Sequence, residues 1–379
     1  MRIHLYGNVL NWGYQFGGYL RALGHDVRLF LDAGESTALY RPEWERDGAT
    51  AASQDWIEMV DVQFRRLLVP GREERRLIAR LGDCDVIQTF GEYAMWAWRT
   101  ETPYVTLSYG GDVSVIPFAR GSLKQRLVGQ LMTHAFRAAD AVVCAMPSHR
   151  VLFEQLKVRP LIFNPHAVPI DTDRCAPAPA DERRRLRAQF SNDLVFFHGA
   201  RQEWTCNDAN DKGNDRLFRA FARFVHGDGA DALLVAVERG RDIGPSKALV
   251  SELGITDHVR WVQELDRPRL VAMLNSADVF FDQFVNGCFG VVTLEALSCG
   301  TPTCLRLDPV DGMDMPPVLD GSSEDAILEA MRVSARPERR AQLAQASRDW
   351  TVAHHDWRVV MEWYVRLYHD VLERRATAA

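Results

Sequence analysis

The sequence lacks several features that would place the protein in common classes. Its seven cysteines include no Cys-x-x-Cys pair, which argues against a disulfide framework and against a zinc ribbon. No apolar run approaches the roughly 20 residues that a membrane-spanning helix needs. No dense tract of Lys and Arg is present, and a formal net charge of −6 gives no general attraction for nucleic acid. These absences favour a reduced protein without a bound metal or a nucleic-acid partner.

The amino-terminal region lacks two further signals. The chain passes from Met1 and Arg2 straight into an apolar stretch at residues 3–6, so no signal peptide and a cytoplasmic location are expected. The loop that follows, residues 7–13, reads Gly-Asn-Val-Leu-Asn-Trp-Gly and not Gly-x-Gly-x-x-Gly. The dinucleotide fingerprint is therefore missing, which disfavours an NAD-dependent oxidoreductase.

Short apolar runs alternate with helical patterns along most of the chain. The length of 379 residues allows two domains, and a charged content of 25% is that of a globular protein. Strand, helix and strand within about 30 residues indicate a parallel, right-handed βαβ unit. The strands are expected at residues 3–6, 27–31, 86–89, 105–107, 141–145, 161–163, 194–197, 232–237, 259–262 and 279–281. Two doubly wound α/β domains follow from this alternation.

A change in composition separates the two domains. Residues 171–180 contain prolines without periodicity, which is typical of a linker. The sequence thus predicts a first domain at 1–170, a linker at 171–188 and a second domain at 189–352. Open α/β sheets bind ligands at the carboxyl ends of their strands, so the site is expected in a cleft between the two domains.

Residues 286–302 combine a turn and a helix directly after the strand at 277–281. They read NGCFGVVTLEALSCGTP, so that two glycines precede a helix that begins near Val291 and ends at Gly300, with Pro302 beyond it. The N–H groups of Val291 and Val292 suit a phosphate, because a helix amino-terminus carries unpaired donors and a favourable dipole. Glu295 follows one turn later, where a carboxylate can accept two sugar hydroxyls.

This stretch resembles the signature of the family-4, retaining, nucleotide-sugar glycosyltransferases of GT-B fold. The matching residues are Phe289, Gly290, Glu295, Ala296, Leu297, Gly300 and Pro302. Gly287 stands where the family usually has a first Glu. The resemblance implies two Rossmann-like, doubly wound domains that face each other across a cleft. It also implies that Glu295 holds the ribose of the donor and that Gly287 and Gly290 line the donor site.

A second pair of residues resembles the family's Gly-Arg and Lys-Gly element. Arg201 follows the strand at 194–197, and Lys212 precedes Gly213 after a loop longer than usual. The resemblance implies that both cations clamp the diphosphate of the donor. Such cations stabilise the charge that develops on a leaving nucleoside diphosphate and replace the metal ion of other transferases.

The first domain carries a segment that resembles the family's His-Gly-x-Asp motif. The strand at 105–107 leads into Tyr109, Gly110, Gly111 and Asp112, so that Tyr109 replaces the usual His beside the donor sugar. A tyrosine donates a hydrogen bond but is a poor base near pH 7. The resemblance places Tyr109 and Asp112 near the transferred sugar. A structural Asp112 that caps the next turn is the alternative.

Other candidate residues for ligand binding lie at three further strand ends. Gly7 and Asn8 fall where many family members have Gly-Gly beside the donor diphosphate and acceptor, and a glycine allows close backbone approach. Gln263 is expected near the base, mainly through its backbone. Asp282 or Gln283 is a candidate to bind the donor sugar in place of the family's first Glu, where this chain has Gly287. A strand-end polar residue that faces water is the alternative for Asp282.

Two helices have alternative interpretations. The amphipathic helix at 123–137 is a candidate for peripheral membrane contact, but the spacing of Leu123, Leu127 and Leu131 favours a core face. The tail at 353–379 resembles the last GT-B helix, which crosses back to the first domain. An ordinary covering helix of the second domain is the alternative.

The combined pattern predicts a metal-independent glycosyltransferase of the hexosyl or N-acetylhexosaminyl type. The expected donor is a nucleoside diphosphate sugar, with a UDP-sugar favoured, and the expected acceptor is a sugar-containing or other small molecule. No further cofactor is expected. A catalytically inactive sugar-nucleotide binder is the main alternative, because Tyr109 and Gly287 depart from the motif. A GT-B enzyme that uses the donor site for epimerisation or non-glycosidic coupling is the third.

Overall fold

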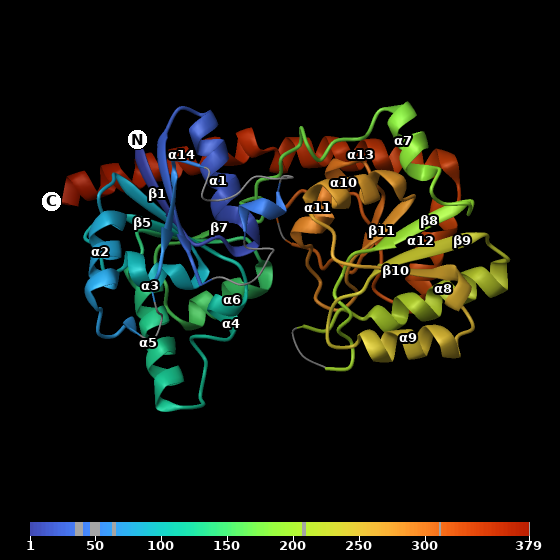
Figure 1. The fold of residues 1–379 in the computed structure, drawn as a ribbon, viewed down its shortest axis with the longest axis horizontal. Helices are drawn as coiled ribbons and strands as arrows, with labels where there is room; N and C mark the ends of the chain where they lie inside the picture. The colour runs from blue at the N-terminus through green and yellow to red at the C-terminus, as the bar shows by residue number, and fades with distance from the viewer. Residues whose placement is uncertain (35–40, 46–53, 63–65, 207–209, 311, 379) are drawn as a thin grey trace. The chain divides into compact units, whose positions relative to one another are not determined.

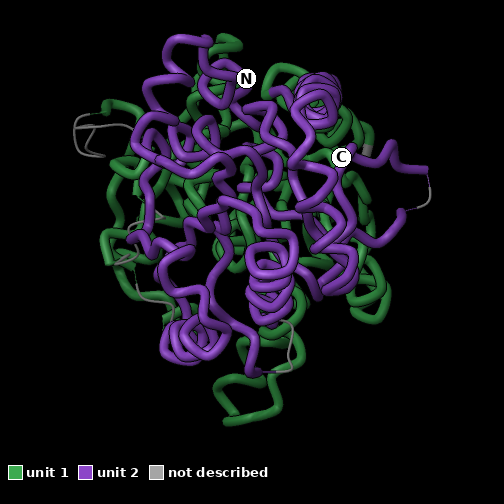
Figure 2. Tube along the Cα trace, turned by 90° about the vertical axis from the view of Figure 1, so that its right-hand side faces the viewer, with its two compact units in different colours: residues 1–169, 357–379 green, residues 170–356 purple. Residues whose placement is uncertain are grey.

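The chain folds into two compact units, which Figures 1 and 2 show in ribbon and tube form. The computed structural model describes residues 1–34, 41–45, 54–62, 66–206, 210–310 and 312–378. Unit 1 consists of Met1–Pro169 and Trp357–Ala379, and unit 2 of Ile170–Asp356. The chain therefore leaves unit 1 once and returns to it near its end.

Unit 1 is built on a parallel seven-stranded sheet of order β3-β2-β1-β4-β5-β6-β7. The register aligns Ile3 of β1 with Val27 of β2 and Val86 of β4. The strands are β1 (Arg2–Tyr6), β2 (Asp26–Asp32), β3 (Ile57–Val60), β4 (Val86–Phe90), β5 (Tyr104–Ser108), β6 (Ala141–Cys144) and β7 (Leu161–Phe163). The six strands expected in this half are confirmed, and β3 is added at one edge.

Helices connect these strands and cover the sheet. They are α1 (Trp12–Ala22), α2 (Arg72–Leu81), α3 (Ala94–Ala97), α4 (Gly111–Ser114), α5 (Leu123–Ala138), α6 (Pro147–Gln155) and α14 (Trp357–Ala378), with 3-10 turns η1 (Val9–Asn11), η3 (Pro42–Trp44) and η6 (Gly91–Tyr93). In the described part of the chain, no helix combines the length and the apolar character that a membrane span requires.

Unit 2 repeats the architecture with a parallel six-stranded sheet of order β10-β9-β8-β11-β12-β13. Its strands are β8 (Leu194–His198), β9 (Ala232–Val237), β10 (Val259–Val262), β11 (Val279–Phe281), β12 (Thr303–Leu305) and β13 (Leu319–Asp320). Its helices are α7 (Ala180–Arg187), α8 (Asn214–Asp228), α9 (Ile243–Glu252), α10 (Arg267–Ser276), α11 (Val291–Ser298), α12 (Glu324–Ser334) and α13 (Pro337–His355), with η7 (Thr256–His258). The four strands expected here are confirmed.

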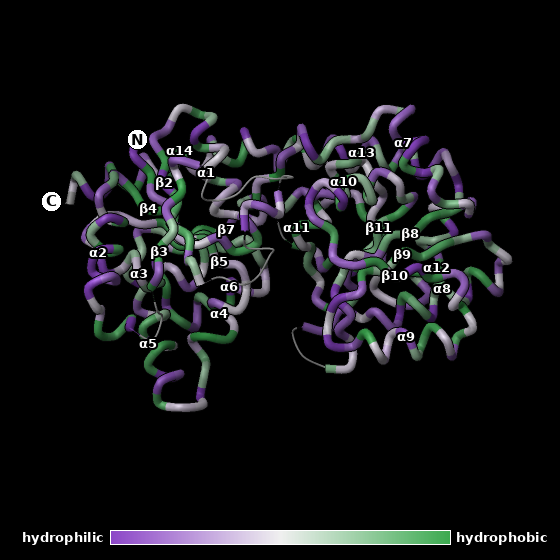
Figure 3. The backbone as a smooth tube through the Cα atoms, viewed as in Figure 1, coloured by the Kyte–Doolittle hydropathy of each residue, from purple (hydrophilic) through white to green (hydrophobic). Residues whose placement is uncertain are grey.

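Each sheet is buried on both faces, because helices cover both sides. All residues of β4, β5, β8 and β9 are buried, which explains their near-continuous apolar sequence. Figure 3 shows the hydrophobic positions along the strands and the hydrophilic ones on the outer helices. Phe196 of β8 anchors the core of unit 2 with ring contacts to Phe221, Phe224 and Phe281.

The segment expected as a linker belongs to unit 2. Residues 171–188 include α7, and Ala178 N donates a hydrogen bond to Asn275 Oδ1 (2.6 Å). The expected end of the second domain at residue 352 lies inside α13, and the unit ends at Asp356. A proline-rich composition thus marks an irregular segment here without separating it from the domain.

The last helix, α14, belongs to unit 1 although its sequence follows unit 2. Tyr364 and Tyr368 are fully buried there. Tyr368 Oη donates to Gln88 Oε1 (2.9 Å), and Tyr364 Oη donates to the carbonyl oxygen of Ala167 (3.2 Å). The Tyr364 ring also packs edge-on against Phe16 of α1, at 5.0 Å between centroids. α14 therefore completes the core of the first unit.

Candidate functional site

In unit 2, the candidate site residues lie at the carboxyl ends of β8 and β11. Gly290 caps α11, and its N–H donates to Thr293 Oγ1 (3.3 Å). Val291 and Val292 form the first turn of this helix, whose N–H groups have no carbonyl partners within the helix. Both residues are half-buried. This helix end presents backbone donors and the positive end of the dipole at the strand edge.

Lys212 lies beside the end of β11. Its Nζ donates to Gln283 Oε1 (2.6 Å), and its carbonyl oxygen accepts from Phe284 N (2.9 Å). Gln283 Nε2 in turn donates to the carbonyl oxygen of Cys288 (2.6 Å), within the turn that leads to α11. The positive charge of Lys212 is thus fixed next to the turn before the helix amino-terminus.

Asn214 ties the Arg201 loop to Lys212. The Asn214 side chain donates to His198 Nε2 (2.7 Å) and to the carbonyl oxygen of Arg201 (3.1 Å), and it accepts from Glu203 N (3.1 Å). The carbonyl oxygen of Glu203 then accepts from Lys212 N (2.6 Å). Arg201 and Lys212 therefore come from one hydrogen-bonded loop. Asn214 was not predicted, although it is a polar residue at a helix start just after Lys212.

The guanidinium of Arg201 is partly exposed and lies beside Glu203. Its Nη1 lies 3.3 Å from Glu203 Oε1, and the side chain is 40% exposed. His198, which precedes the loop, is fully buried, and its Nδ1–H donates to the carbonyl oxygen of Phe281 (2.9 Å). Burial lowers the pKa of His198 to about 4. The imidazole is therefore neutral near pH 7 and supports the loop without adding charge.

Asp282 is buried between Lys212 and α11. Thr293 Oγ1 donates to Asp282 Oδ2. Burial raises the pKa of Asp282, and the Thr293 hydrogen bond and the charge of Lys212 oppose this rise. The carboxylate thus faces the helix start instead of water, unlike a strand-end polar residue directed to solvent.

Gly287 has a structural reason to differ from the family's Glu. Its φ is +63°, and a Cβ added there would lie 2.1 Å from Asp308 Oδ2. Asp308 N donates to the carbonyl oxygen of Gly287 (3.0 Å), and Arg306 Nε donates to Asp308 Oδ1 (3.1 Å). A carboxylate from the loop after β12 therefore occupies the space beside Gly287. No sequence signal indicated Asp308.

Glu295 lies in the buried part of α11 and faces Arg267 of α10. Arg267 Nη1 donates to Glu295 Oε1, and the two side chains are 12% and 3% exposed. Among the described residues, Glu295 Oε2 accepts no hydrogen bond. The ion pair fixes the orientation of the carboxylate and leaves one oxygen unused. Arg267 was not predicted, because it lies 28 residues earlier in the chain.

Gln263 is hydrogen-bonded to a different group of residues from those around Lys212. Gln263 directly follows β10 and is exposed. Its Nε2 donates to Oε2 of Glu238 (3.3 Å), the residue that follows β9. Lys247 Nζ donates to the other Glu238 oxygen (2.5 Å). These side chains form a polar group at the ends of β9 and β10, next to β8.

In unit 1, Asp112 is fully buried at the end of β5. Its Oδ1 accepts from Gly110 N (2.7 Å), Tyr109 N (3.2 Å) and Ser108 Oγ (3.3 Å). Within the described residues, its Oδ2 is buried without a hydrogen bond. Burial raises the pKa of Asp112 to about 6, and the Glu92 charge adds to this effect. Asp112 therefore organises the loop, as the structural alternative predicted, and also keeps one oxygen unused.

Tyr109 belongs to this loop, and His149 lies next to it. Tyr109 Oη donates to Oε2 of Glu92 (2.6 Å), which lies in the connection that follows β4. His149 of α6 is 7% exposed, and its Cε1 lies 4.0 Å from the position of a Cβ on Gly110. Burial lowers the pKa of His149. The neutral imidazole of His149, from the next strand–helix connection, thus lies beside the Gly-Gly-Asp segment. The sequence did not predict His149 as a site residue.

Gly7 and Asn8 form a tight turn after β1. Gly7 has a φ of +95°, and a Cβ there would lie 2.3 Å from the Tyr93 ring. Asn8 is buried; its Oδ1 accepts from Tyr14 N (2.8 Å), and its Nδ2 donates to Asn11 Oδ1 (2.7 Å). Both Asn8 side-chain groups hold the turn before α1, so its described contacts are structural.

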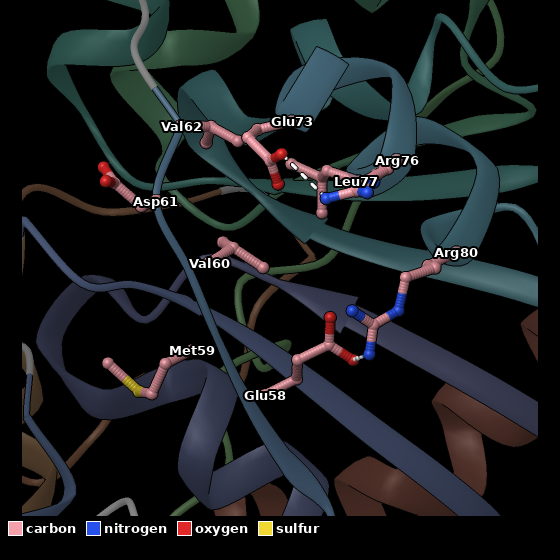
Figure 4. A pocket seen from close by; sticks show the side chains of 9 residues that line it. All are labelled: Glu58, Met59, Val60, Asp61, Val62, Glu73, Arg76, Leu77 and Arg80. Carbon is pink, nitrogen blue, oxygen red and sulfur yellow. Dashed lines mark hydrogen bonds and ion pairs between the residues drawn. The ribbon is translucent and has the colours of Figure 1, made fainter.

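A separate pocket of unit 1 contains none of the predicted site residues. It has a volume of about 410 Å³ and lies between β3 and α2. Figure 4 shows Glu58 facing Arg80 and Glu73 facing Arg76 across its wall. Glu58 and Glu73 are each paired with an arginine of this pocket, whereas Asp61 lies away from both pairs. Within the described residues, no group of three or more His, Cys, Asp and Glu side chains is arranged to hold a metal ion.

Comparison with known families identifies the region that holds the unit 2 site. Residues 207–306, which include Lys212, Asp282 and Glu295, match the family model described as "Glycosyl transferases group 1". The similarity to group 1 glycosyltransferases thus covers residues 207–306, a part of unit 2 that ends just after β12.

Curated relatives of the chain are glycosyltransferases. It is 31% identical over 209 residues to a GDP-mannose-dependent alpha-(1-6)-phosphatidylinositol monomannoside mannosyltransferase of Mycolicibacterium smegmatis, covering 50% of this chain and 51% of that protein. It is also 31% identical over 181 residues to a D-inositol 3-phosphate glycosyltransferase of Saccharomonospora viridis, covering 42% and 40%. The chain thus spans about half the length of these relatives or less.

Solved structures show that the whole chain has the GT-B fold. Sucrose-phosphate synthase from Thermosynechococcus elongatus superposes with a TM-score of 0.69 at 17% identity, covering 99% of this chain and 100% of that one. Anabaena HepE in complex with UDP superposes with a TM-score of 0.68 at 15% identity, covering 97% and 99%. The expected α/β class and GT-B architecture are confirmed.

Proposed function

We propose that the protein is a family-4 glycosyltransferase that moves a sugar from a nucleoside diphosphate sugar to an acceptor with retention of configuration. The observation that carries this proposal is the cluster at the carboxyl ends of β8 and β11. There, the Arg201 loop, Lys212 and the amino-terminus of α11 are tied together through Asn214 and Gln283. The group 1 match over the same residues supports it.

In this proposal, the cluster stabilises the leaving diphosphate. The bond between the anomeric carbon and the diphosphate oxygen breaks, and a bond from the acceptor oxygen forms on the same face of the sugar. The acceptor proton passes to the leaving phosphate oxygen, so no protein base is required. Arg201 and Lys212 stabilise the developing negative charge, and the N–H groups of Val291 and Val292 bind the distal phosphate.

The carboxylates of unit 2 have distinct proposed roles. Glu295, oriented by Arg267, uses Oε2 to accept a ribose hydroxyl. Asp308 supplies the acidic group that Gly287 lacks, and its carboxylate accepts a hydrogen bond from a hydroxyl of the donor sugar. Asp282 positions the helix start through Thr293. Gln263 lies near the base, beside Glu238.

In unit 1, Tyr109 and Asp112 are proposed to lie near the transferred sugar. The backbone of the Gly7–Asn8 turn is proposed to lie close to the donor diphosphate and the acceptor. The proposed donor sugar is a hexose or N-acetylhexosamine, and the proposed acceptor is a sugar-containing or other small molecule. We propose that the transfer needs no metal ion and takes place in the cytoplasm. A UDP-sugar is the favoured donor, and HepE was solved with UDP-glucose. GDP-mannose is the named donor of the M. smegmatis relative.

Calorimetric titration with UDP, GDP, ADP and TDP tests the donor site first. We expect one nucleotide to bind at micromolar concentration, and its sugar conjugates to release the nucleoside diphosphate when an acceptor is supplied. No binding to any of the four would overturn the proposal. Tight binding without hydrolysis or transfer, across a panel of sugar conjugates, would instead identify a sugar-nucleotide binder.

A further inference from the structure

The amino-terminal end of α5 is exposed on every side. Residues 121–127 are all exposed, with Leu123 at 69% and Leu127 at 37%. Only Leu131 of the predicted core face is buried, so the expectation that all three leucines face the core is wrong for the first two. Figures 1 and 2 show this end of α5 and the preceding loop extending beyond the neighbouring elements of unit 1.

The orientation of α5 explains this exposure. Its buried residues are Gly129, Leu131, Met132, Ala135 and Phe136. Helical geometry places Leu123 on the side opposite to them and Leu127 near the edge of their face, one turn before Leu131. The capping box of Ser122 and Gln125 holds the helix start, with Ser122 N donating to Gln125 Oε1 (2.8 Å). Local capping therefore stabilises the exposed end without tertiary packing on its leucines.

The preceding loop adds two more exposed apolar side chains. Val115 is 64% exposed and Phe118 is 38% exposed. The loop is held against α5 at Gly129, where an added Cβ would lie 2.6 Å from the carbonyl oxygen of Ile116. Four of the twelve exposed large hydrophobic side chains in the described residues thus fall within residues 115–127. Such clustering marks an interaction surface more than scattered exposed residues do.

The same segment carries charge of one sign. Residues 113–139 contain no Asp or Glu, although the whole chain has a net charge of −6. Arg120, Lys124 and Arg126 are all exposed and flank the leucines. We call the α5 tip the surface formed by Val115, Phe118, Arg120, Leu123, Lys124, Arg126 and Leu127.

We propose that the α5 tip docks unit 1 onto the surface of an anionic phospholipid bilayer. Apolar side chains on a short projecting helix enter the boundary between headgroups and acyl chains. Flanking Lys and Arg side chains keep their charged ends at the level of the lipid phosphates. The absence of acidic residues from this segment favours an anionic surface over a protein partner of mixed charge.

Vesicle co-sedimentation of the full chain tests this docking. We expect binding to vesicles of phosphatidylcholine mixed with phosphatidylglycerol, weakening as salt rises from about 0.05 to about 0.5 M because the charges are screened. Vesicles of phosphatidylcholine alone should bind at least tenfold more weakly. Equal binding to both vesicles, or no binding to either, would overturn the proposal.

Two variants separate the charged and apolar parts of the α5 tip. The triple variant Arg120→Gln, Lys124→Gln, Arg126→Gln should bind anionic vesicles about a hundredfold more weakly, since each cation near the surface contributes about a factor of ten or less. The double variant Leu123→Ser, Leu127→Ser should lose binding at least tenfold. Both variants should keep the wild-type melting temperature, because these side chains do not pack in the core.

Matched control variants lie elsewhere on unit 1. Arg72→Gln, Arg75→Gln, Arg76→Gln removes three exposed cations from α2, and Val151→Ser, Val359→Ser removes two exposed apolar side chains. Both controls should bind like the wild type. Equal losses in controls and tip variants would overturn the proposal. Self-association that Leu123→Ser, Leu127→Ser abolishes, seen by light scattering without lipid, would make the tip a contact between copies and also overturn it.

Discussion

The two sheets end in sites whose polar groups are satisfied in different ways. In unit 2, the loop of Arg201 and Lys212 is joined to the turn before α11 through Asn214 and Gln283. In unit 1, the Asp112 loop holds a fully buried carboxyl with one oxygen left without a hydrogen bond in the described structure. Glu295 of unit 2 also keeps one oxygen without a hydrogen bond among the described residues, but its other oxygen is paired with Arg267. In the part of the chain that the structure describes, the hydrogen bonds of Asp112 come only from its own loop, and burial raises its pKa to about 6. The comparison teaches that unit 2 orients its buried carboxylate with a cation, whereas unit 1 uses neutral donors and leaves a group that titrates near pH 6.

The largest effect is expected from Glu295→Ala in unit 2. This variant removes the carboxylate that pairs with the largely buried guanidinium of Arg267, and breaking a buried ion pair costs about 3–5 kcal/mol of the free energy of unfolding. Urea denaturation without ligand measures it. The double variant Glu295→Ala, Arg267→Met should regain most of the loss. An unchanged stability in the single variant would show that Glu295 is not held by the ion pair.

Lys212→Ala should reduce turnover strongly without a comparable loss of stability. Removal of one preorganised charge donor costs about a hundredfold to a thousandfold in rate. Steady-state release of the nucleoside diphosphate measures this effect. Arg332→Ala is the matched control, because Arg332 pairs with Asp228 outside the Lys212 cluster and should change turnover less than twofold. Full activity of Lys212→Ala would remove this cation from the mechanism.

Asp112→Asn should reveal the pH response of unit 1. Burial raises the pKa of Asp112 from 3.8 to about 6, so the folded state keeps a proton that the unfolded state releases. Its stabilising contribution is complete below pH 3.8 and is lost as the pH rises to about 6, by about 3 kcal/mol at about 1.36 kcal/mol per pH unit. The difference in unfolding free energy between variant and wild type, measured from pH 3.5 to 7, should change by roughly this amount. A constant difference would contradict the raised pKa.

Asp308→Asn should have the smallest effect, on donor affinity. A hydrogen bond to a charged group contributes about 1.5 kcal/mol or more, so the KM for the donor should rise about tenfold. Calorimetry with the nucleoside diphosphate alone is the control and should show little change, because Asp308 is proposed to touch only the sugar. Equal weakening for both ligands would place Asp308 on the nucleotide instead.

Local patterns of the sequence predicted the fold well, down to the individual strands and the bounds of α11. Apolar runs located the strands, and Gly300 with Pro302 marked the end of α11. Such signals are local, because a helix stop or a buried strand is encoded within a few residues. The matches at Arg201 and Lys212 likewise depended on short motifs at strand ends.

Contacts between segments that are distant in the chain could not be predicted from the sequence. Arg267 meets Glu295 because α10 and α11 pack together, and Asp308 reaches Gly287 from the loop after β12. Helical spacing also grouped Leu123 and Leu127 with Leu131 without showing which face of α5 meets the sheet. The side that a helix buries depends on its docking angle, which no single sequence pattern specifies.

The placement of α14 has a consequence for synthesis on the ribosome. Unit 2 is one continuous stretch of chain, so all of its residues can emerge and fold before the protein is finished. Unit 1 receives the buried rings of Tyr364 and Tyr368 only from a segment that is translated after unit 2. Unit 1 is therefore begun before unit 2 and completed after it, and a premature stop after Asp356 would leave unit 1 with an open core.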